Sequence, residues 1–318
     1  MKGPLSVPSA IAYYLKTRRQ LGFALVNEGW LLRGLARYAR QNHHRGPLTT
    51  ELVLRWAQLP QAAAPLWWAR RLAIARQFAQ FWVAFDSRTQ VPPAGFFGPS
   101  HRRPPVHIYT PEEIAALLAA TTSLGSAEGL RVATFRTLLG LLACTGLRIS
   151  EALRLRPQDL DSTAHTLLVP AAKFSPARRL PVHPSTSQAL VRYDRLCQQR
   201  LRAPALRRAL FLSPQGRPLS RDYAERVFRQ LRDQLGWSQR PRARLHDLRH
   251  TFAVGCLVRW NRQPGAVGSK ILALSAYLGH RHVTDTYWYF TAIPQLLSVS
   301  SARFEQLAHR NAKGTGHE

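Results

Sequence analysis

The stretch that decides the fold is residues 145–153, Thr145-Gly146-Leu147-Arg148-Ile149-Ser150-Glu151-Ala152-Leu153. Apolar residues precede it, and glycine commonly ends a helix, so an apolar helix is predicted to end at Thr145 and Gly146. Ser150 is predicted to cap a second helix that continues through Glu151. Arg148 therefore lies in a turn between two helices, just before the cap of the second.

The sequence around this stretch is mixed and mainly helical. Thr110-Pro111-Glu112-Glu113 combines a capping box with proline at the first helical position, so a helix is predicted to begin there. Short strands are predicted from about Leu160 to His183, around the turn KFSPAR, and a strand-like run follows at residues 209–213. Further helices are predicted to begin near three positions, Ser220, His246 and Ser269. The predicted fold class is mainly α with a small β-sheet.

Residues 1–90 are predicted to form a bundle of about four helices. The first two are predicted to end near Gly22 and Gln41. Capping residues and a first-turn proline mark the expected starts, which are Ser9, Asn27, Thr49 with Thr50, and Pro65. Apolar residues recur at helical spacing in the second helix (Leu31, Leu35, Tyr38) and in the fourth (Trp68, Leu72, Ala75, Trp82). We interpret these tryptophans as core residues rather than as platforms for base stacking.

The segment from Val91 to His107 carries five prolines and two glycines and is interpreted as a linker. It separates an N-terminal domain, residues 1–90, from a C-terminal domain, residues 108–318. Residues 1–107 contain 15 basic and 3 acidic side chains, and the rest contains 30 and 14. Both parts are basic, as expected if both contact the same polyanion.

Net charge is the strongest global signal. The 318 residues carry 45 basic and 17 acidic side chains, a formal charge of +28, which attracts nucleic acid. Forty of the basic residues are arginine, which codon bias can explain, but codon bias does not explain the shortage of acids. The three cysteines form no CxxC pair, which argues against a disulfide framework or a structural zinc site. No apolar run suits a signal peptide or a membrane span, so a cytoplasmic location is expected.

Four parts of the C-terminal domain together resemble the tyrosine recombinase family, the lambda integrase type. The first is residues 145–153, and the second is Lys173 in the predicted hairpin turn. The third is the run from His246 to Arg249, followed by His250. The fourth is Leu278-Gly279-His280, with Tyr289 nine residues beyond the histidine. One such motif is a weak signal, but four in order over residues 108 to 290 are a strong one.

This resemblance implies a helical, SAM-like core-binding domain followed by a catalytic domain of the DNA breaking-rejoining enzyme fold. It implies that Tyr289 attacks a DNA phosphorus and leaves a 3′-phosphotyrosine and a free 5′-hydroxyl. The implied roles of the remaining catalytic residues are stabilisation of the phosphate oxygens by Arg148 and Arg249, general-acid catalysis by Lys173, proton transfer at the tyrosine by His246, and a hydrogen bond to the phosphate from His280. Neither metal, ATP nor another cofactor is implied.

The chemistry independently suits these residue types. Cleaving a phosphodiester without a metal requires positive donors around non-bridging oxygens that gain charge, and arginine forks match those oxygens. His246 and His250 lie one helical turn apart and could hold a metal, but the zincin pattern of further ligands is missing. Glu151 is expected to support Arg148 or its helix.

Two of these assignments, Lys173 and the nucleophilic tyrosine, have alternatives. Phe174 and Ala172 flank Lys173 where the family often has glycine, yet Lys173 is the only lysine between positions 17 and 269. Tyr287 and Tyr289 point about 200° apart on a helix, so only one can face the phosphate. The spacing from His280 favours Tyr289, which leaves Tyr287 and Trp288 as packing residues.

The expected partner is double-stranded DNA with specific recombination sites, bound by a homotetramer that is monomeric or dimeric when free. The apolar pattern from Pro294 to Leu307 predicts a C-terminal helix, which packs into a neighbouring protomer or on its own domain. Helper recombinases, a bacterial mobile element and nucleoid association are further expectations. The alternatives are a type IB topoisomerase-like enzyme and an architectural DNA-binding protein that does not cut.

Overall fold

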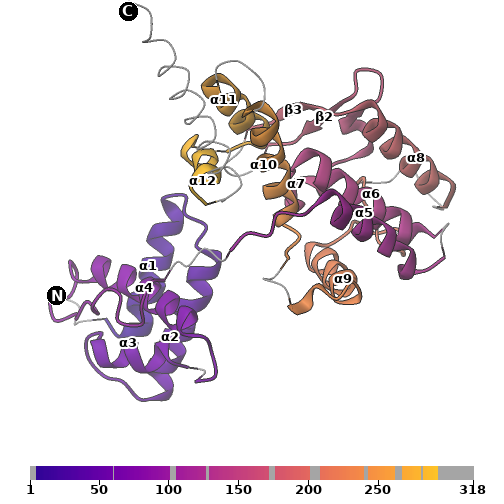
Figure 1. The fold of residues 1–318 in the computed structure, drawn as a ribbon. Helices are drawn as coiled ribbons and strands as arrows, with labels where there is room; N and C mark the ends of the chain where they lie inside the picture. The colour runs from indigo at the N-terminus through magenta and orange to yellow at the C-terminus, as the bar shows by residue number, and fades with distance from the viewer. Residues whose placement is uncertain are drawn as a thin grey trace, which may run out of the picture. The chain divides into compact units, whose positions relative to one another are not determined.

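The computed structural model describes residues 5–59, 61–100, 105–126, 129–171, 176–200, 208–239, 243–261, 267–280 and 282–292. The chain divides into two compact units, Met1–Pro104 and Pro105–Glu318 (Figure 1). Helices dominate both, and the described strands form a single small sheet in the second unit, which confirms the predicted fold class. No helix among the described residues is long and apolar enough to cross a membrane.

The N-terminal unit contains four helices, α1 (Val7–Gln20), α2 (Val26–Gln41), α3 (Thr50–Ala57) and α4 (Pro65–Trp82). Two of the predicted starts hold: the Thr49 hydroxyl accepts a hydrogen bond from the N–H of Leu52, and Pro65 opens α4. The other two are wrong. Proline fits the first turn of a helix, so α1 begins ahead of Pro8 rather than at Ser9, and the left-handed Leu25 precedes α2 in place of Asn27.

The core of the N-terminal unit lies where these helices meet. Leu35, Ala75 and Phe78 are fully buried, and Trp82 is buried as well, whereas Trp68 is half-buried against Phe97. Val91 and Phe97 also pack against this core, so the compact unit extends past residue 90 to residue 104 and includes most of the predicted linker.

The C-terminal unit begins with α5 (Pro111–Ala120), whose predicted capping box is present: the Thr110 hydroxyl accepts from the Glu113 N–H, and the Glu113 carboxylate accepts from the Thr110 N–H. A short 3₁₀ turn (Thr121–Leu124) leads to α6 (Leu130–Thr145), which is followed by a second short helix, α7 (Ile149–Ala152). Gly146 ends α6 in the left-handed conformation, φ 63°, as its position predicts.

The start of α7 corrects the prediction for Ser150. Arg148, not Ser150, is the capping residue, and it has an extended backbone. The carboxylate of Glu151 accepts a hydrogen bond of 2.9 Å from the Arg148 N–H, so the acid satisfies the first free donor of the helix. Ser150 consequently lies inside the first turn.

The sheet is antiparallel in the order β1 (Leu160–Asp161), β2 (Thr166–Val169) and β3 (Arg178–Pro181). A 3₁₀ turn (Pro157–Asp159) precedes it, and α8 (Pro184–Arg200) follows it. The predicted strand at residues 209–213 is reduced to one isolated bridge, between Leu212 and Pro218. These residues pair with the Leu155 carbonyl and with their own turn instead of joining the sheet.

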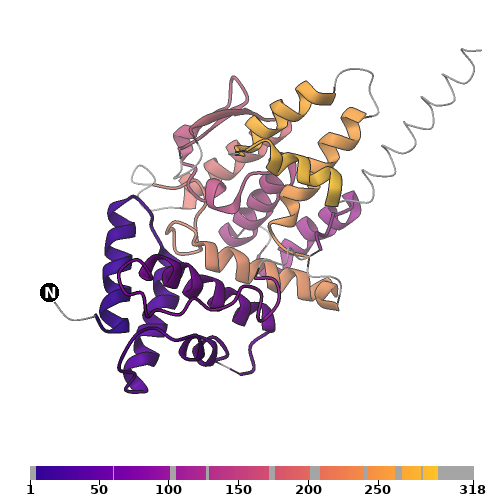
Figure 2. The same cartoon turned by 90° about the vertical axis from the view of Figure 1, so that its left-hand side faces the viewer.

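The remaining helices are α9 (Arg221–Gln234), α10 (Asp247–Asn261), α11 (Val267–Leu278) and α12 (Thr284–Ala292), with a 3₁₀ turn (Trp237–Gln239) after α9. Helix α9 begins next to Ser220, as predicted, and the Ser220 hydroxyl caps it by accepting from the Tyr223 N–H. Helices α10, α11 and α12 gather into a small apolar cluster beside α6 and α7 (Figures 1 and 2). The predicted helix from Pro294 to Leu307 lies outside the described residues.

Candidate active site

The candidate site is organised around Glu151, a carboxylate that is 2% exposed. Nη1 of Arg148 donates to its Oε1 over 3.0 Å, and Nη2 of Arg178 donates to its Oε2 over 3.0 Å. Nη1 of Arg249 is 4.0 Å from the same Oε2. Burial alone would raise the pKa of Glu151, but hydrogen bonds from Arg178 and from the Arg148 backbone outweigh it and lower the pKa. The expected support of Arg148 by Glu151 is present.

Arg249 is the most deeply buried of these cations, with a side chain that is 3% exposed. Its Nη1 donates to the Gly146 carbonyl and its Nη2 to the Leu278 carbonyl, each over 2.8 Å. Both acceptors lie at helix C-termini, where the helix dipole favours positive charge. Desolvation and the charge of Arg148 lower the pKa of Arg249 to about 10, so the guanidinium stays charged at neutral pH.

The end of α6 requires glycine at position 146 for two reasons, the space around the residue and its backbone conformation. A Cβ at this position would lie 2.6 Å from Cδ1 of Phe252 and 3.1 Å from Cδ2 of Leu278. The residue's left-handed φ is also unfavourable for side chains. A glycine here therefore lets the Gly146 carbonyl approach Arg249.

Tyr289 lies on α12 and is 2% exposed, within the cluster of α10 and α11. Its ring is 5.6 Å from that of His250 and 6.3 Å from that of His280, centroid to centroid. Desolvation raises the pKa of Tyr289, although the charge of Arg249 and a hydrogen bond from it act in the opposite direction. The phenol is accordingly protonated at neutral pH in the DNA-free protein.

Tyr287 and Tyr289 differ in burial as their opposite directions on a helix predict. Tyr287 is 50% exposed, whereas Tyr289 is buried. Tyr287, which is predicted to be a packing residue, is half exposed, because it lies off the face that α12 presents to α10 and α11. The side chain of Trp288 lies outside the described residues.

The two histidines assigned to the site have lowered pKa values. His280 lies on the turn after α11, with Nδ1 2.7 Å from the Thr286 hydroxyl, and desolvation followed by the charges of Arg249 and Arg148 lowers its pKa to about 4. His246 precedes α10 and packs edge-on against His250 with ring centroids 4.8 Å apart. His246 is exposed, yet partial desolvation by neighbouring protein atoms and the charges of His250 and Arg249 lower its pKa to about 4.

The structure thus brings five of the six predicted residues into one region: Arg148, His246, Arg249, His280 and Tyr289. Lys173 lies outside the described residues. The residue that sequence reasoning missed is Arg178, which contacts Glu151 with both amino groups. The available signal was an acid inside an arginine-rich motif, since a buried carboxylate needs cationic partners. Within the described ranges, no group of three or more metal-ligating side chains occurs.

The model of the phage integrase family matches residues 108–295. The chain belongs to the phage integrase family. This membership confirms the expected relationship to tyrosine recombinases, enzymes that cleave and rejoin DNA. A putative integrase/recombinase of Sinorhizobium fredii, y4rB, is 38% identical over 309 residues, covering 93% of this chain and 96% of its own. A second from the same organism, y4rE, is 34% identical and covers 91% of this chain and 93% of its own.

The integrase fold is also found in solved structures. The Tn1549 transposon integrase, in complex with transposon right end DNA, superposes with a TM-score of 0.70 at 18% identity, covering 96% of this chain and all of that one. A lambda integrase dimer bound to a COC′ core site superposes with a TM-score of 0.62 at 15% identity, covering 90% and 77%. These likenesses confirm a tyrosine recombinase fold for this integrase family chain.

The lowered pKa of His280 predicts a loss of stability in acid. A folded-state pKa of about 4 lies below the ordinary value of about 6.5, so the unfolded chain binds more protons between these pH values. The free energy of unfolding should therefore fall as the pH drops from about 6.5 towards 4. Melting temperatures of the DNA-free protein at pH 7.5 and 5.0 measure this fall, which should be smaller in His280→Gln. His282→Gln, which removes an exposed ring two residues away, should melt like the wild type at both pH values.

Proposed function

We propose that this recombinase cleaves and rejoins DNA at specific sites through a 3′-phosphotyrosine formed by Tyr289, without a metal or ATP. The observation that carries the proposal is the position of the buried Tyr289, whose ring lies 5.6 Å from that of His250 and 6.3 Å from that of His280 and whose pKa the charge of Arg249 acts to lower. A phenol next to a guanidinium is placed to share one phosphate with it. The family membership supplies the DNA chemistry that such an arrangement suits.

In this mechanism each residue acts at a stated atom. The Tyr289 oxygen forms a bond to phosphorus while the bond from phosphorus to the 5′-oxygen breaks, and Lys173 gives that oxygen a proton. Arg148 and Arg249 stabilise the non-bridging oxygens as they gain charge. His246, neutral at pH 7 because of its lowered pKa, accepts the proton that the Tyr289 phenol loses as it attacks. Religation reverses the steps, and the phosphotyrosine conserves the bond energy.

His280 is proposed to donate a hydrogen bond to the phosphate, because its ring nitrogen Nε2 can carry the proton. At neutral pH its lowered pKa leaves one ring proton. When the Thr286 hydroxyl donates to Nδ1, that proton is on Nε2, which can then donate to a phosphate oxygen. Thr286 is fully buried, so this orientation of the ring is held from within α12.

The test is a covalent adduct. A duplex selected for binding from a random library, nicked near its cleavage site so that religation is impossible, should form an SDS-resistant protein–DNA complex. Since the proposed chemistry uses only cations, imidazoles and a phenol, the same amount of complex should form in EDTA. A strict requirement for added magnesium or zinc contradicts the mechanism.

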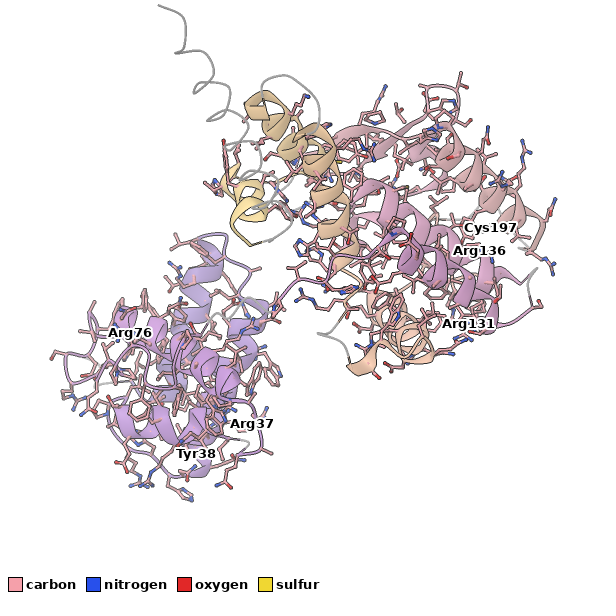
Figure 3. The ribbon with its side chains drawn as sticks, viewed as in Figure 1. Arg37, Tyr38, Arg76, Arg131, Arg136 and Cys197 are labelled. Carbon is pink, nitrogen blue, oxygen red and sulfur yellow. The ribbon has the colours of Figure 1, made fainter. Side chains whose placement is uncertain are left out.

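The N-terminal unit is proposed to bind the DNA backbone through a groove of about 780 Å³ between α1 and α2. Five cationic residues and no acidic one are among its lining residues; the cations are Lys16, Arg19, Arg33, Arg37 and Arg40. Arg37 projects from α2 (Figure 3). Each phosphate contact of this kind releases counterions and makes the affinity depend on salt.

Neutralising two of these cations should weaken DNA binding by a similar amount for every DNA sequence, because phosphates are common to all of them. The variant R33Q/R37Q should lower the slope of log affinity against log salt concentration by about 2, as measured by fluorescence anisotropy. Arg55→Gln is the matched control, because Arg55 is exposed and already paired with Glu51 over 2.6 Å. An unchanged slope in R33Q/R37Q removes the groove from the DNA interface.

We further propose that four protomers assemble on two DNA sites, with a free protein that is monomeric or dimeric and with helper recombinases in a bacterial mobile element. The names of the Sinorhizobium relatives favour recombination over simple relaxation of DNA. Formation of a two-duplex synaptic complex in a gel shift separates a recombinase from a type IB topoisomerase-like enzyme.

A further inference from the structure

All three guanidinium nitrogens of Arg178 donate hydrogen bonds to acceptors of the protein itself. It is the first residue of β3, and its side chain is 11% exposed. Both amino groups donate to Glu151, Nη1 to Oε1 over 3.2 Å and Nη2 to Oε2 over 3.0 Å. Nε donates to the Tyr277 carbonyl over 2.8 Å, and Nη2 also reaches the Leu278 carbonyl over 3.3 Å. Such a forked pair is the strongest arrangement that arginine and carboxylate form.

This fork limits how Arg148 can bind the same carboxylate. The side chain of Arg148 reaches Glu151 through Nη1 alone, which also donates to the Gly279 carbonyl over 3.2 Å. Among the described residues, none accepts a hydrogen bond from Nη2 of Arg148, and the side chain is 36% exposed. Arg148 is therefore oriented by one amino group and has the other available for a phosphate.

We propose that Arg178 is a positioning residue of this active site. Because it donates to both oxygens of Glu151 and to the C-terminal carbonyls of α11, only one amino group of Arg148 binds Glu151, and the other is directed at the scissile phosphate. This inference rests on the proposed function. It adds a cation that itself touches no DNA to the residues assigned to the chemistry.

Loss of Arg178 has two physical consequences at the site. Without its competitor, Glu151 can accept both amino groups of Arg148, and the bidentate pair withdraws Arg148 from the phosphate. In addition, the Tyr277 carbonyl loses its donor, but the Leu278 carbonyl keeps the 2.8 Å hydrogen bond from Nη2 of Arg249, so the turn that carries His280 stays anchored. Displacements of about 1 Å at a phosphoryl site can cost about 10²-fold in rate.

The test compares Arg178→Met, Arg148→Ala and the double variant on the nicked duplex at saturating protein. Arg178→Met should slow adduct formation by about 10²-fold, while the dissociation constant from gel shift stays within about twofold, since Arg178 does not contact DNA. If Arg178 acts through Arg148, the double variant should be no slower than Arg148→Ala alone. Effects that multiply instead overturn the proposal, because a general loss of structure would slow the reaction independently of Arg148.

Two further variants keep the proposal testable. Arg178→Lys keeps the charge but lacks the fork, so its rate should stay well below that of the wild type even if Arg178→Met does not fold; full activity in Arg178→Lys overturns the inference. Arg179→Met is the matched control, since Arg179 is exposed on the next position of β3, and its rate should match the wild type. A wild-type protein that forms no adduct refutes the proposed function itself, whereas a normal wild type with a fully active Arg178→Met refutes only this inference.

Discussion

We expect Tyr289→Phe to form no covalent complex with the nicked duplex, while its affinity for intact DNA should stay within about twofold of the wild type. The substitution removes the attacking oxygen and nothing else, and phenylalanine fills the same apolar cluster between α10 and α11. No other group can replace a nucleophile that leaves a covalent bond, so the loss should be complete rather than partial. SDS gel electrophoresis of labelled DNA measures the adduct.

Tyr287→Phe is the matched control for this result. It removes the same hydroxyl from the same helix two residues away, where the side chain is 50% exposed. Adduct formation should be unchanged. If Tyr289→Phe still formed the adduct and Tyr287→Phe did not, the assignment of the nucleophile would be wrong.

Glu151→Gln should destabilise the catalytic unit by about 3 kcal/mol or more, because it leaves cations around a buried neutral amide. Arg148 and Arg178 lose their counter-charge, and the new amide NH₂ faces guanidinium donors. The midpoint of thermal unfolding should fall by several degrees, about 2–4 °C for each kcal/mol in a unit of this size. Adduct formation should fall as well, since Arg148 loses its orienting partner.

Glu225→Gln is the control for charge alone. Glu225 pairs with Arg221 over 2.7 Å on α9, but both side chains are substantially exposed, at 42% and 64%. Such a pair contributes little to stability, so the melting temperature should change by no more than about 1 °C. A Glu151→Gln variant that melts like this control shows that the arginines do not depend on the carboxylate.

Local signals in the sequence were enough for several elements. The capping box at Thr110, the glycine at position 146 and the proline at position 65 each predict a boundary that the structure confirms, because a side chain or a backbone torsion within a few residues decides it. The start of α7 was mispredicted for a related reason. Ser150 is a good capping residue by type, but Arg148, two residues earlier, is the cap, because the buried Glu151 carboxylate accepts its backbone N–H.

The candidate site was predictable as a set of residues but not as a geometry. Motif spacing named Arg148, His246, Arg249, His280 and Tyr289, and the fold brings them together. Nothing local shows that Arg178 reaches Glu151, 27 residues earlier, or carbonyls 99 and 100 residues later in the chain. The exposure of Tyr287 could not be predicted from the sequence either, since it depends on which face of α12 packs against α10 and α11.

The cations of this site are held largely by main-chain oxygens, those of Gly146, Tyr277, Leu278 and Gly279. A carbonyl belongs to every amino acid, so the side chains of Tyr277 and Leu278 can change without removing the acceptor, provided that α11 ends in the same place. Gly146 and Gly279 are different, because their left-handed backbones favour glycine. Replacing an arginine, by contrast, deletes the donor outright. Divergent relatives could therefore vary the residues that hold the guanidinium groups while retaining the same pattern of acceptors. Searches that weigh only residue identity will miss this half of the site.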